Sequence, residues 1–197
     1  MRKRLFDIIA SLVGLVLLMP FFLLIALFIK LDSDGGVFFR QVRVGRFGMP
    51  FKIHKFRTMY IEAESKGRLT VGDDARITKP GKLLRKYKLD ELPQLIDVLL
   101  GDMSFVGPRP EVKQFMDAYP ADIQEKVLSV RPGITDLASI EMVDENRLLA
   151  EYNNPTRAYI DVILPIKQRH YMNYVESQSF WLDLKIIFLT IYKILGR

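Results

Sequence analysis

The chain has 197 residues, which suits one domain with a hydrophobic core, and its lack of cysteine excludes disulfides and thiolate chemistry. Hydrophobic residues make up 49% of the chain although 26% of it is charged, which indicates a charged domain joined to a membrane-seeking part. The formal net charge of +6 favours anionic partners such as phosphorylated substrates, nucleic acid or an acidic lipid surface.

The first predicted element is an apolar helix near the N-terminus. Residues 8–29 contain no charged side chain, and a helix needs about 20 apolar residues to cross a bilayer. A signal peptide is disfavoured, because the run is long and no A-x-A-like cleavage site follows it. Two arrangements remain open: a simple spanning helix, and a re-entrant helix that enters the bilayer and turns back.

Two observations favour the re-entrant arrangement. Pro20 lies in the middle of the apolar run, where it removes a helical hydrogen bond and kinks the helix. Cations flank both ends of the run: Arg2, Lys3, Arg4, Lys30, Arg40, Arg43 and Arg46. The positive-inside rule would place both flanks in the cytoplasm, which a single span cannot satisfy. Because kinked spans are common, these residues alone leave both arrangements open.

The next segment predicts a β-hairpin. Residues 37–44 and 51–59 have the composition of two short strands, and a turn containing glycine and proline separates them. The second strand carries Lys55 and Arg57, for which a solvated strand face is the simplest interpretation. His54 has no second ligand at metal spacing, so we expect it to be structural.

Residues 79–110 centre on two adjacent carboxylates, Asp90 and Glu91. Five cations precede the pair: Lys79, Lys82, Arg85, Lys86 and Lys88. An acidic pair among cations suits a site where an anionic group meets a carboxylate, directly or through a metal ion. Thr78 predicts the N-cap of one helix, and we expect Asp90 to open the next, whose free N–H groups would keep it ionised at neutral pH. A simple N-cap aspartate is the alternative.

Two proline-containing loops each present an arginine. Arg109 lies between two prolines, and Arg131 precedes another. A fixed backbone suits arginine for bidentate contact with phosphate oxygens. Farther along the chain, we expect residues 136–154 to be irregular and Lys167 to be exposed on a helix.

The C-terminal segment predicts a helix with an apolar stripe. The stripe residues recur at helical spacing: Phe180, Trp181, Leu184, Ile187, Phe188, Ile191 and Leu195. Such a stripe is typical of a core helix, or of a helix that lies in a membrane interface. We favour the interface, because the N-terminal run already places the chain at a membrane.

Together these residues predict a membrane-attached basic protein with carboxylates in an arginine-rich pocket. Such a pocket suits phosphoryl transfer, with Mg²⁺ neutralising phosphate charge. The sequence contains neither a G-x-x-x-x-G-K-[ST] loop nor a G-x-G-x-x-G after a strand. Ordinary NTPase, kinase and dinucleotide-binding functions therefore lack support.

Five motifs occur in order along the chain. They are K-F-R-T-M at 55–59, L-D-E-L-P-Q-L at 89–95, G-D-M-S-F-V-G-P-R-P at 101–110, V-R-P-G-I-T at 130–135 and S-F-W-L-D-L-K-I-I at 179–187. With these motifs the chain resembles the bacterial sugar transferase family, the monotopic phosphoglycosyl transferases that act on polyprenyl phosphate. The resemblance extends from Arg2 to about Leu195, and it is to the minimal catalytic form.

The resemblance implies transfer of a sugar 1-phosphate from a UDP-sugar to undecaprenyl phosphate with release of UMP, the first membrane step of a bacterial surface-glycan pathway. It implies that Asp90 forms a covalent phosphosugar-aspartate, which the lipid phosphate then attacks. Glu91 would hold Mg²⁺ together with Asp90, or assist the second attack. The basic motif positions are assigned to substrate phosphates: Lys55, Arg57, Arg85, Arg109 and Arg131. Asp183 matches a motif acid with a supporting role.

We expect an α+β fold, mostly helical with a small β-hairpin and amphipathic interfacial helices. The resemblance implies that residues 1–34 form a re-entrant membrane helix kinked at Pro20. Residues 35–197 would form the catalytic domain on the cytoplasmic face of the bacterial inner membrane. Met19 stands where family members carry serine before the proline, so any hydroxyl hydrogen bond to the freed carbonyl is lost. Acidic residues in 136–143, where many members have neutral ones, leave the sugar open.

Two functions of other classes stay open. A basic nucleic-acid-binding protein would leave the apolar N-terminus unexplained, and its cations lack an aromatic-interleaved stripe. A catalytically inactive membrane scaffold of the same fold is the second, and the intact Asp90-Glu91 pair argues against it. Turnover of UDP-sugars, or a salt-dependent shift with RNA or DNA, would distinguish them. We expect the bilayer and both substrates as partners and no nucleic acid, while a homodimer stays open.

Overall fold

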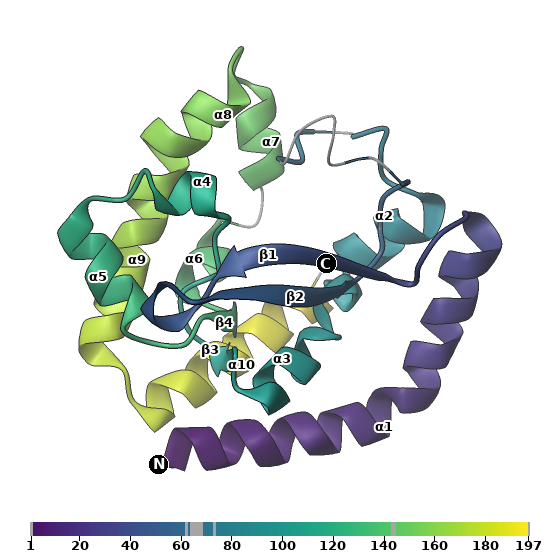
Figure 1. Ribbon diagram of the computed structural model, residues 1–197, viewed down its shortest axis with the longest axis horizontal. Helices are drawn as coiled ribbons and strands as arrows, with labels where there is room; N and C mark the ends of the chain where they lie inside the picture. The colour runs from purple at the N-terminus through teal and green to yellow at the C-terminus, as the bar shows by residue number, and fades with distance from the viewer. Residues whose placement is uncertain (1, 62, 64–68, 73, 143–144, 197) are drawn as a thin grey trace.

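The computed structural model describes residues 2–61, 63, 69–72, 74–142 and 145–196. Within these residues the fold is mostly helical, with two sheets of two strands each (Figure 1). The elements in chain order are α1 (Arg2–Asp32), β1 (Phe38–Val44), η1 (Arg46–Gly48), β2 (Pro50–Phe56), α2 (Lys79–Lys86), η3 (Leu89–Glu91), α3 (Gln94–Leu100), β3 (Ser104–Val106), α4 (Lys113–Met116), α5 (Ala121–Leu128), β4 (Gly133–Thr135), α6 (Leu137–Glu141), α7 (Glu145–Ala150), α8 (Pro155–Ala158), η4 (Tyr159–Ile163), α9 (Leu164–Ser177) and α10 (Phe180–Leu195). The predicted mostly helical fold with a small hairpin is confirmed.

The β1–β2 hairpin crosses the middle of the molecule (Figure 1). Its strands pair in antiparallel register from Phe38 opposite Phe56 to Val44 opposite Pro50. The prediction of a hairpin is therefore confirmed, although β2 ends at Phe56 and Met59 lies beyond it. The hairpin packs against η3 and α3 through β2 and against α4 through β1, so it can position side chains between these elements.

A second sheet, which the sequence did not predict, pairs β3 with β4 in parallel. The two strands have three residues each, too few to show an alternating pattern. The backbones approach closely: a Cβ on Gly133 would lie 2.1 Å from the nitrogen of Gly107, so only glycine fits there. This pairing holds the two arginine-bearing loops next to each other in space.

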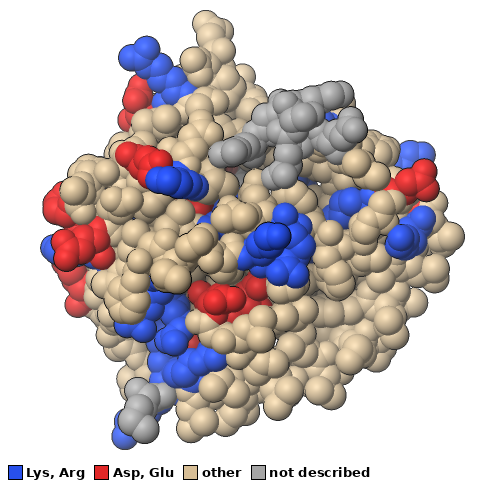
Figure 2. Space-filling view, viewed as in Figure 1, with Lys and Arg blue, Asp and Glu red and all other residues tan. Residues whose placement is uncertain are grey.

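Helix α1 is the one element among the described residues that is long and apolar enough to cross a membrane, judged by length and composition. Pro20 lies within it without ending the helix. Figure 1 shows α1 bent partway along, so that its first part runs under the domain and its second part rises along one side. The space-filling view shows a broad surface without charged side chains along this helix (Figure 2).

Both ends of α1 are tied to the rest of the chain. Near its start, Lys3 Nζ lies 2.7 Å from Asp183 Oδ2 of α10. At its end, Arg57 donates hydrogen bonds to the backbone carbonyls of Ser33 and Asp34. The two ends of the helix therefore contact the same domain.

Two expectations about the second half of the chain are wrong. Residues 136–154 are not irregular, because α6 and α7 lie there; residues 143 and 144 are outside the described part. Asp136 caps α6 by accepting a hydrogen bond from the Ser139 amide. Helices α6 and α7 are too short for hydrophobic periodicity to reveal them in the sequence. Lys167 is 5% exposed, because its ammonium pairs with Glu145 inside the fold.

The C-terminal helix α10 is present where the apolar stripe predicts it. Its inner face contributes Ile186 to a buried cluster with Val106 of β3 and Tyr174 of α9. Its outer face leaves Trp181 and Tyr192 exposed. One side of this helix is thus core, and the other is an exposed aromatic surface.

Candidate active site

A cavity of about 830 Å³ lies beside the hairpin, within the size range of roughly 300–1,000 Å³ that is usual for small-molecule sites. One wall comes from β1, β2, α2, η3 and the loop after β3. The opposite wall comes from α4, α6, α7, η4 and α9. Figure 2 shows basic and acidic side chains near one another in the middle of this face.

The carboxylate pair lies on a 3-10 turn rather than at the start of an α-helix. Lys88 precedes the turn with φ 56°, a left-handed conformation that is strained for a residue with a side chain. The following helix, α3, begins later, at Gln94. The prediction that Asp90 caps that helix is therefore wrong. The strained turn instead places Asp90 and Glu91 on the wall of the cavity.

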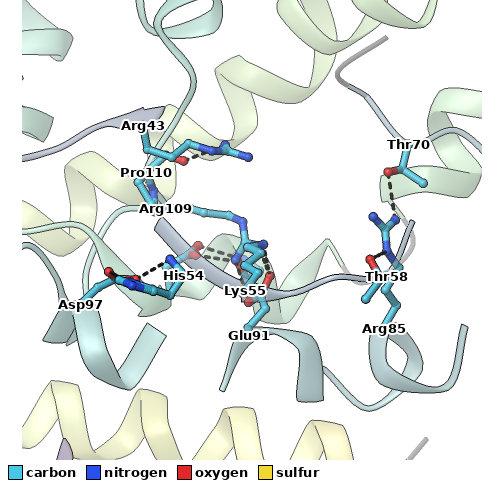
Figure 3. A network of polar contacts seen from close by, with 12 residues as sticks. Arg43, His54, Lys55, Thr58, Thr70, Arg85, Glu91, Asp97, Arg109 and Pro110 are labelled. Atoms are coloured by element: carbon cyan, nitrogen blue, oxygen red, sulfur yellow. Dashed lines mark hydrogen bonds and ion pairs between the residues drawn. The ribbon is translucent and has the colours of Figure 1, made fainter. Parts of the chain in front are cut away.

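Glu91 is held between two cations. Lys55 Nζ lies 2.8 Å from Glu91 Oε1. The Arg109 guanidinium contacts both carboxylate oxygens, with Nη1 3.2 Å from Oε2 (Figure 3). Burial opposes ionisation, but the attraction of Arg109 and then of Lys55 holds the pKa of Glu91 well below its usual range. Glu91 is therefore a permanent anion that organises these two cations.

Asp90 differs from its neighbour. In the part of the chain that the structure describes, its Oδ1 is buried without a hydrogen-bond partner. Burial, followed by the charge of Glu91, raises the pKa of Asp90. The expectation that helix N–H groups keep this carboxyl ionised is thus wrong, because no helix begins there. An incompletely solvated carboxylate in a cavity is suited to bind a ligand or to react with one.

Lys55 and a third cation, Arg85, line the same wall. Burial lowers the pKa of Lys55 to about 8 against the attraction of Glu91. Arg85 is oriented by two hydroxyls, with Nε 2.9 Å from Thr58 Oγ1 and Nη1 2.9 Å from Thr70 Oγ1 (Figure 3). Cations buried at a cost in hydration favour an anionic ligand in the cavity.

Two of the predicted phosphate-binding arginines have structural contacts instead. Arg57 lines the cavity, but its guanidinium binds the carbonyls that end α1. Arg131 does not line the cavity, and its Nε donates to the carbonyl of Gly101 at 2.7 Å. Asp183 does not line the cavity either, and it pairs with Lys3 near the start of α1. The structure therefore brings together Asp90, Glu91, Lys55, Arg85 and Arg109.

His54 and Asp97 connect the hairpin to the helix that follows the carboxylates. Asp97 Oδ2 accepts from the His54 backbone amide at 2.9 Å, and Oδ1 lies 2.6 Å from Nδ1 of the ring (Figure 3). The expectation that His54 is structural agrees with these contacts. The clamp fixes strand β2 against α3, and thereby the position of Lys55 relative to Glu91.

Arg43 is a site residue that the sequence reasoning missed. It lines the cavity, and its Nη1 donates to the carbonyl of Pro110 at 3.0 Å. Among the described residues, its Nε is buried without a hydrogen-bond partner. Figure 3 shows its guanidinium above the Lys55 ammonium and the Arg109 guanidinium. Strand alternation could have found it, because Arg43 is four residues from Phe39, the partner of Lys55, and thus on the same face.

The fit of a metal ion depends on Asp90. Among the described residues, no group of three or more His, Cys, Asp or Glu side chains could hold a metal ion. Mg²⁺ often takes only one or two carboxylates and fills its other positions with substrate phosphates and water. Asp90 Oδ1 meets this requirement, whereas Glu91 would first have to release a cation.

Comparison with known proteins matches the bacterial sugar transferase family model over residues 1–197. A Klebsiella pneumoniae protein named UDP-glucose:undecaprenyl-phosphate glucose-1-phosphate transferase is 43% identical over 196 residues, which are 97% of this chain and 39% of that protein. The uncharacterized sugar transferase EpsL of Bacillus subtilis is 41% identical over 193 residues, 98% of this chain and 87% of EpsL.

A third relative is the UDP-N-acetylgalactosamine-undecaprenyl-phosphate N-acetylgalactosaminephosphotransferase of Aeromonas hydrophila. It is 40% identical over 196 residues, 98% of this chain and 43% of that protein. The chain thus spans less than half the length of the Klebsiella and Aeromonas proteins, but most of EpsL.

Proposed function

Because the chain belongs to the bacterial sugar transferase family, we propose that it transfers a sugar 1-phosphate from a UDP-sugar to undecaprenyl phosphate and releases UMP. The relatives in Klebsiella pneumoniae and Aeromonas hydrophila are named for two different sugars, so the sugar does not follow from similarity. The site geometry supports the reaction class, and it suggests a role for each residue.

One observation carries the proposal: among the described residues, Oδ1 of the buried Asp90 has no hydrogen-bond partner, although cations line the same cavity. Lys55 and Arg109 form ion pairs with Glu91, so their charges are in position before a substrate binds. Arg85 adds a third cation on the same wall. Preorganised cations stabilise negative charge that develops on a departing phosphate.

In the first step, Asp90 acts as a nucleophile toward the sugar-bearing phosphorus of the UDP-sugar. A bond forms between a carboxylate oxygen and phosphorus, and the bond from that phosphorus to the oxygen bridging to UMP breaks. UMP leaves with the electron pair of the broken bond. Lys55, Arg85 and Arg109 hold the phosphate oxygens and stabilise the charge on UMP. The product is a phosphosugar ester of Asp90.

In the second step, an oxygen of undecaprenyl phosphate attacks the same phosphorus. The bond from Asp90 to phosphorus breaks and the carboxylate is restored. A covalent intermediate suits one soluble and one membrane-held substrate, since each reaches the same nucleophile in turn. Mg²⁺, held by Asp90 and by Glu91 after release of a cation, would neutralise diphosphate charge when bound.

The membrane arrangement that we propose is re-entrant, with the catalytic domain on the cytoplasmic face of the inner membrane. Both ends of α1 contact the same domain, through Lys3 at the start and Arg57 at the end. A helix that crossed the bilayer would place these two ends on opposite sides. The bend in α1 and the proline within it support a helix that enters and returns (Figure 1).

The test is UMP release from a panel of UDP-sugars by purified protein in detergent, with Mg²⁺ and undecaprenyl phosphate. We expect sustained release with at least one sugar that requires both the lipid phosphate and the metal. Without lipid phosphate, mass spectrometry should find a phosphosugar adduct on Asp90. Absence of release across the panel would contradict the transfer, whereas release without an adduct would contradict only the covalent route.

A further inference from the structure

The end of the cavity between α4 and α9 is lined by a chain of four polar side chains. Glu145 Oε2 lies 2.8 Å from Lys167 Nζ, which donates to the Tyr159 hydroxyl at 3.0 Å. That hydroxyl donates in turn to Glu111 Oε1 at 2.7 Å. All four residues line the cavity, and the Glu145 side chain is 25% exposed. Because each side chain holds the next, two carboxylates have fixed positions facing the same space.

This end adjoins the phosphate-binding cations. Lys55 pairs across the hairpin with Phe39, and Arg43 follows four residues later on the same face of β1, roughly 13 Å along the strand. The amide of the next residue, Val44, donates to the carbonyl of Glu111 at 2.9 Å. Arg43 therefore lies between the catalytic carboxylates and the Glu111 end.

The other end of the cavity has a different chemistry. It is lined by Phe38, Phe56 and Tyr60. The rings of Phe38 and Phe56 stack with centroids 5.6 Å apart and an interplanar angle of 17°. Of these three rings, Phe56 is 1% exposed and packs in a core cluster with Ile25, Ile29 and Leu84, whereas Phe38 and Tyr60 are exposed. Aromatic rings offer few hydrogen bonds to a hydroxylated sugar ring. Carboxylates accept hydrogen bonds from hydroxyls, and an ammonium donates to them.

On the basis of the transfer reaction proposed above, we propose that Glu111, Tyr159, Lys167 and Glu145 bind the hydroxyl groups of the sugar ring and select the sugar. The sugar is attached to the phosphate that Asp90 attacks, so it must lie beside that site. A sugar epimer whose hydroxyl points away from these carboxylates would lose a hydrogen bond to a charged acceptor, and sites built to bind a hydroxyl discriminate strongly.

The experiment compares two epimeric donors, UDP-glucose and UDP-galactose, in wild-type protein and in Glu145→Gln. We expect kcat/KM for the preferred donor to fall about tenfold to a hundredfold, as is usual for loss of a hydrogen bond to a charged group. The loss of kcat/KM for the other epimer should be smaller, so the ratio of kcat/KM between the two donors should decrease. Inhibition by UMP, which lacks the sugar, should stay unchanged.

The matched control is Glu141→Gln, the same substitution on the neighbouring helix α6. Glu141 pairs with His170 on the surface and does not line the cavity. It should leave both donors and their ratio unchanged. Glu111→Gln repeats the test from the other end of the chain of contacts, and melting temperatures identify any variant that fails to fold.

Two outcomes would overturn the assignment. Equal losses for both epimers would show that Glu145 only supports the fold, and weaker UMP inhibition would show that this end holds the nucleotide. Calorimetric binding of both donors to Asp90→Asn and to Asp90→Asn with Glu145→Gln makes the same comparison without turnover. Selective sugar binding with no UMP release by wild-type protein would contradict the transfer reaction and support the sugar site.

Discussion

Two buried clusters of charged side chains differ in whether their hydrogen bonds are complete. At the start of α1, Lys3 donates to Asp183, to the Tyr174 hydroxyl and to the carbonyl of Val106. Tyr174 also donates to the second oxygen of Asp183 at 2.7 Å. This cluster uses all three donors of the ammonium, and each carboxylate oxygen accepts a hydrogen bond, so every charged group in it has a partner.

The cluster in the cavity is incomplete. Lys55 and Arg109 both bind Glu91, while Oδ1 of the adjacent Asp90 has no hydrogen-bond partner among the described residues. Unsatisfied buried groups are costly, and they persist where a ligand completes them. Charge alone therefore does not identify a site. Asp183 and Asp90 are both buried acids, but within the described part of the chain only Asp90 of these two has a carboxylate oxygen without a hydrogen-bond partner.

The largest expected effect comes from removing the open carboxylate. Asp90→Asn should lower transfer by about 10⁴-fold or more, because the amide is a poor nucleophile. The melting temperature should stay the same or rise, since a buried charge without a partner is removed. UMP release and thermal melting measure the two effects. Asp102→Asn, outside the cavity, is the control, and full activity of Asp90→Asn would contradict the nucleophile assignment.

The second effect tests which of the two arginine loops belongs to the open cluster. Arg109→Lys keeps the charge but loses the two-pronged contact with Glu91, so kcat/KM should fall about 10²- to 10³-fold. Arg131→Lys makes the same change in the neighbouring loop, where the guanidinium binds the Gly101 carbonyl. Its activity should remain within a few-fold of wild type. Equal losses in both variants would place Arg131 in the site as well.

This contrast shows what the sequence could predict. The sequence pointed to Asp90 and Glu91 together, because adjacent residues stay close in any fold, and to Arg109 through its proline-flanked loop and the family motif. It could not separate Arg109 from Arg131, since their different contacts depend on the parallel pairing of β3 with β4. That pairing joins segments almost thirty residues apart, and strands of three residues are too short to show a sequence pattern that would predict it.

Two of the positions that sequence reasoning misjudged share one cause. Lys167 and Arg43 were expected on exposed or flanking positions, because charged side chains are seldom buried. Lys167 is buried and Arg43 is partly buried by tertiary contacts with distant segments, through Glu145 in one case and the Pro110 carbonyl in the other. The long uncharged run predicted α1, and helical spacing of apolar residues predicted α10, since both patterns are local and need no partner segment.

The third effect concerns the pH at which the open cluster keeps its charge. Burial lowers the pKa of Lys55 to about 8, so kcat/KM should fall about tenfold per pH unit above that value as the ammonium is lost. Lys55→Arg should move this limb to higher pH, because arginine stays protonated. A profile that is identical in the two proteins would assign the limb to another group.

The same shift has a consequence for stability. The pKa of Lys55 is 10.5 in the unfolded chain and about 8 in the fold, so between these values the unfolded chain binds more protons. The contribution of Lys55 to the free energy of unfolding should therefore increase from pH 8 to pH 10.5. Denaturant unfolding of wild-type protein and of Lys55→Met across this range would measure it, and equal slopes would contradict it.

The smallest effect on activity is expected at the complete cluster. Lys3→Met leaves Asp183 without its cation and should lower the melting temperature by several degrees. The combination with Asp183→Asn should recover part of the loss, because the unpaired charge is then gone. Turnover per folded molecule should stay within a few-fold of wild type in both proteins. If Lys3→Met lowered turnover as far as Arg109→Lys without lowering the melting temperature, the complete cluster would take part in the reaction, and the distinction between the two clusters would fail.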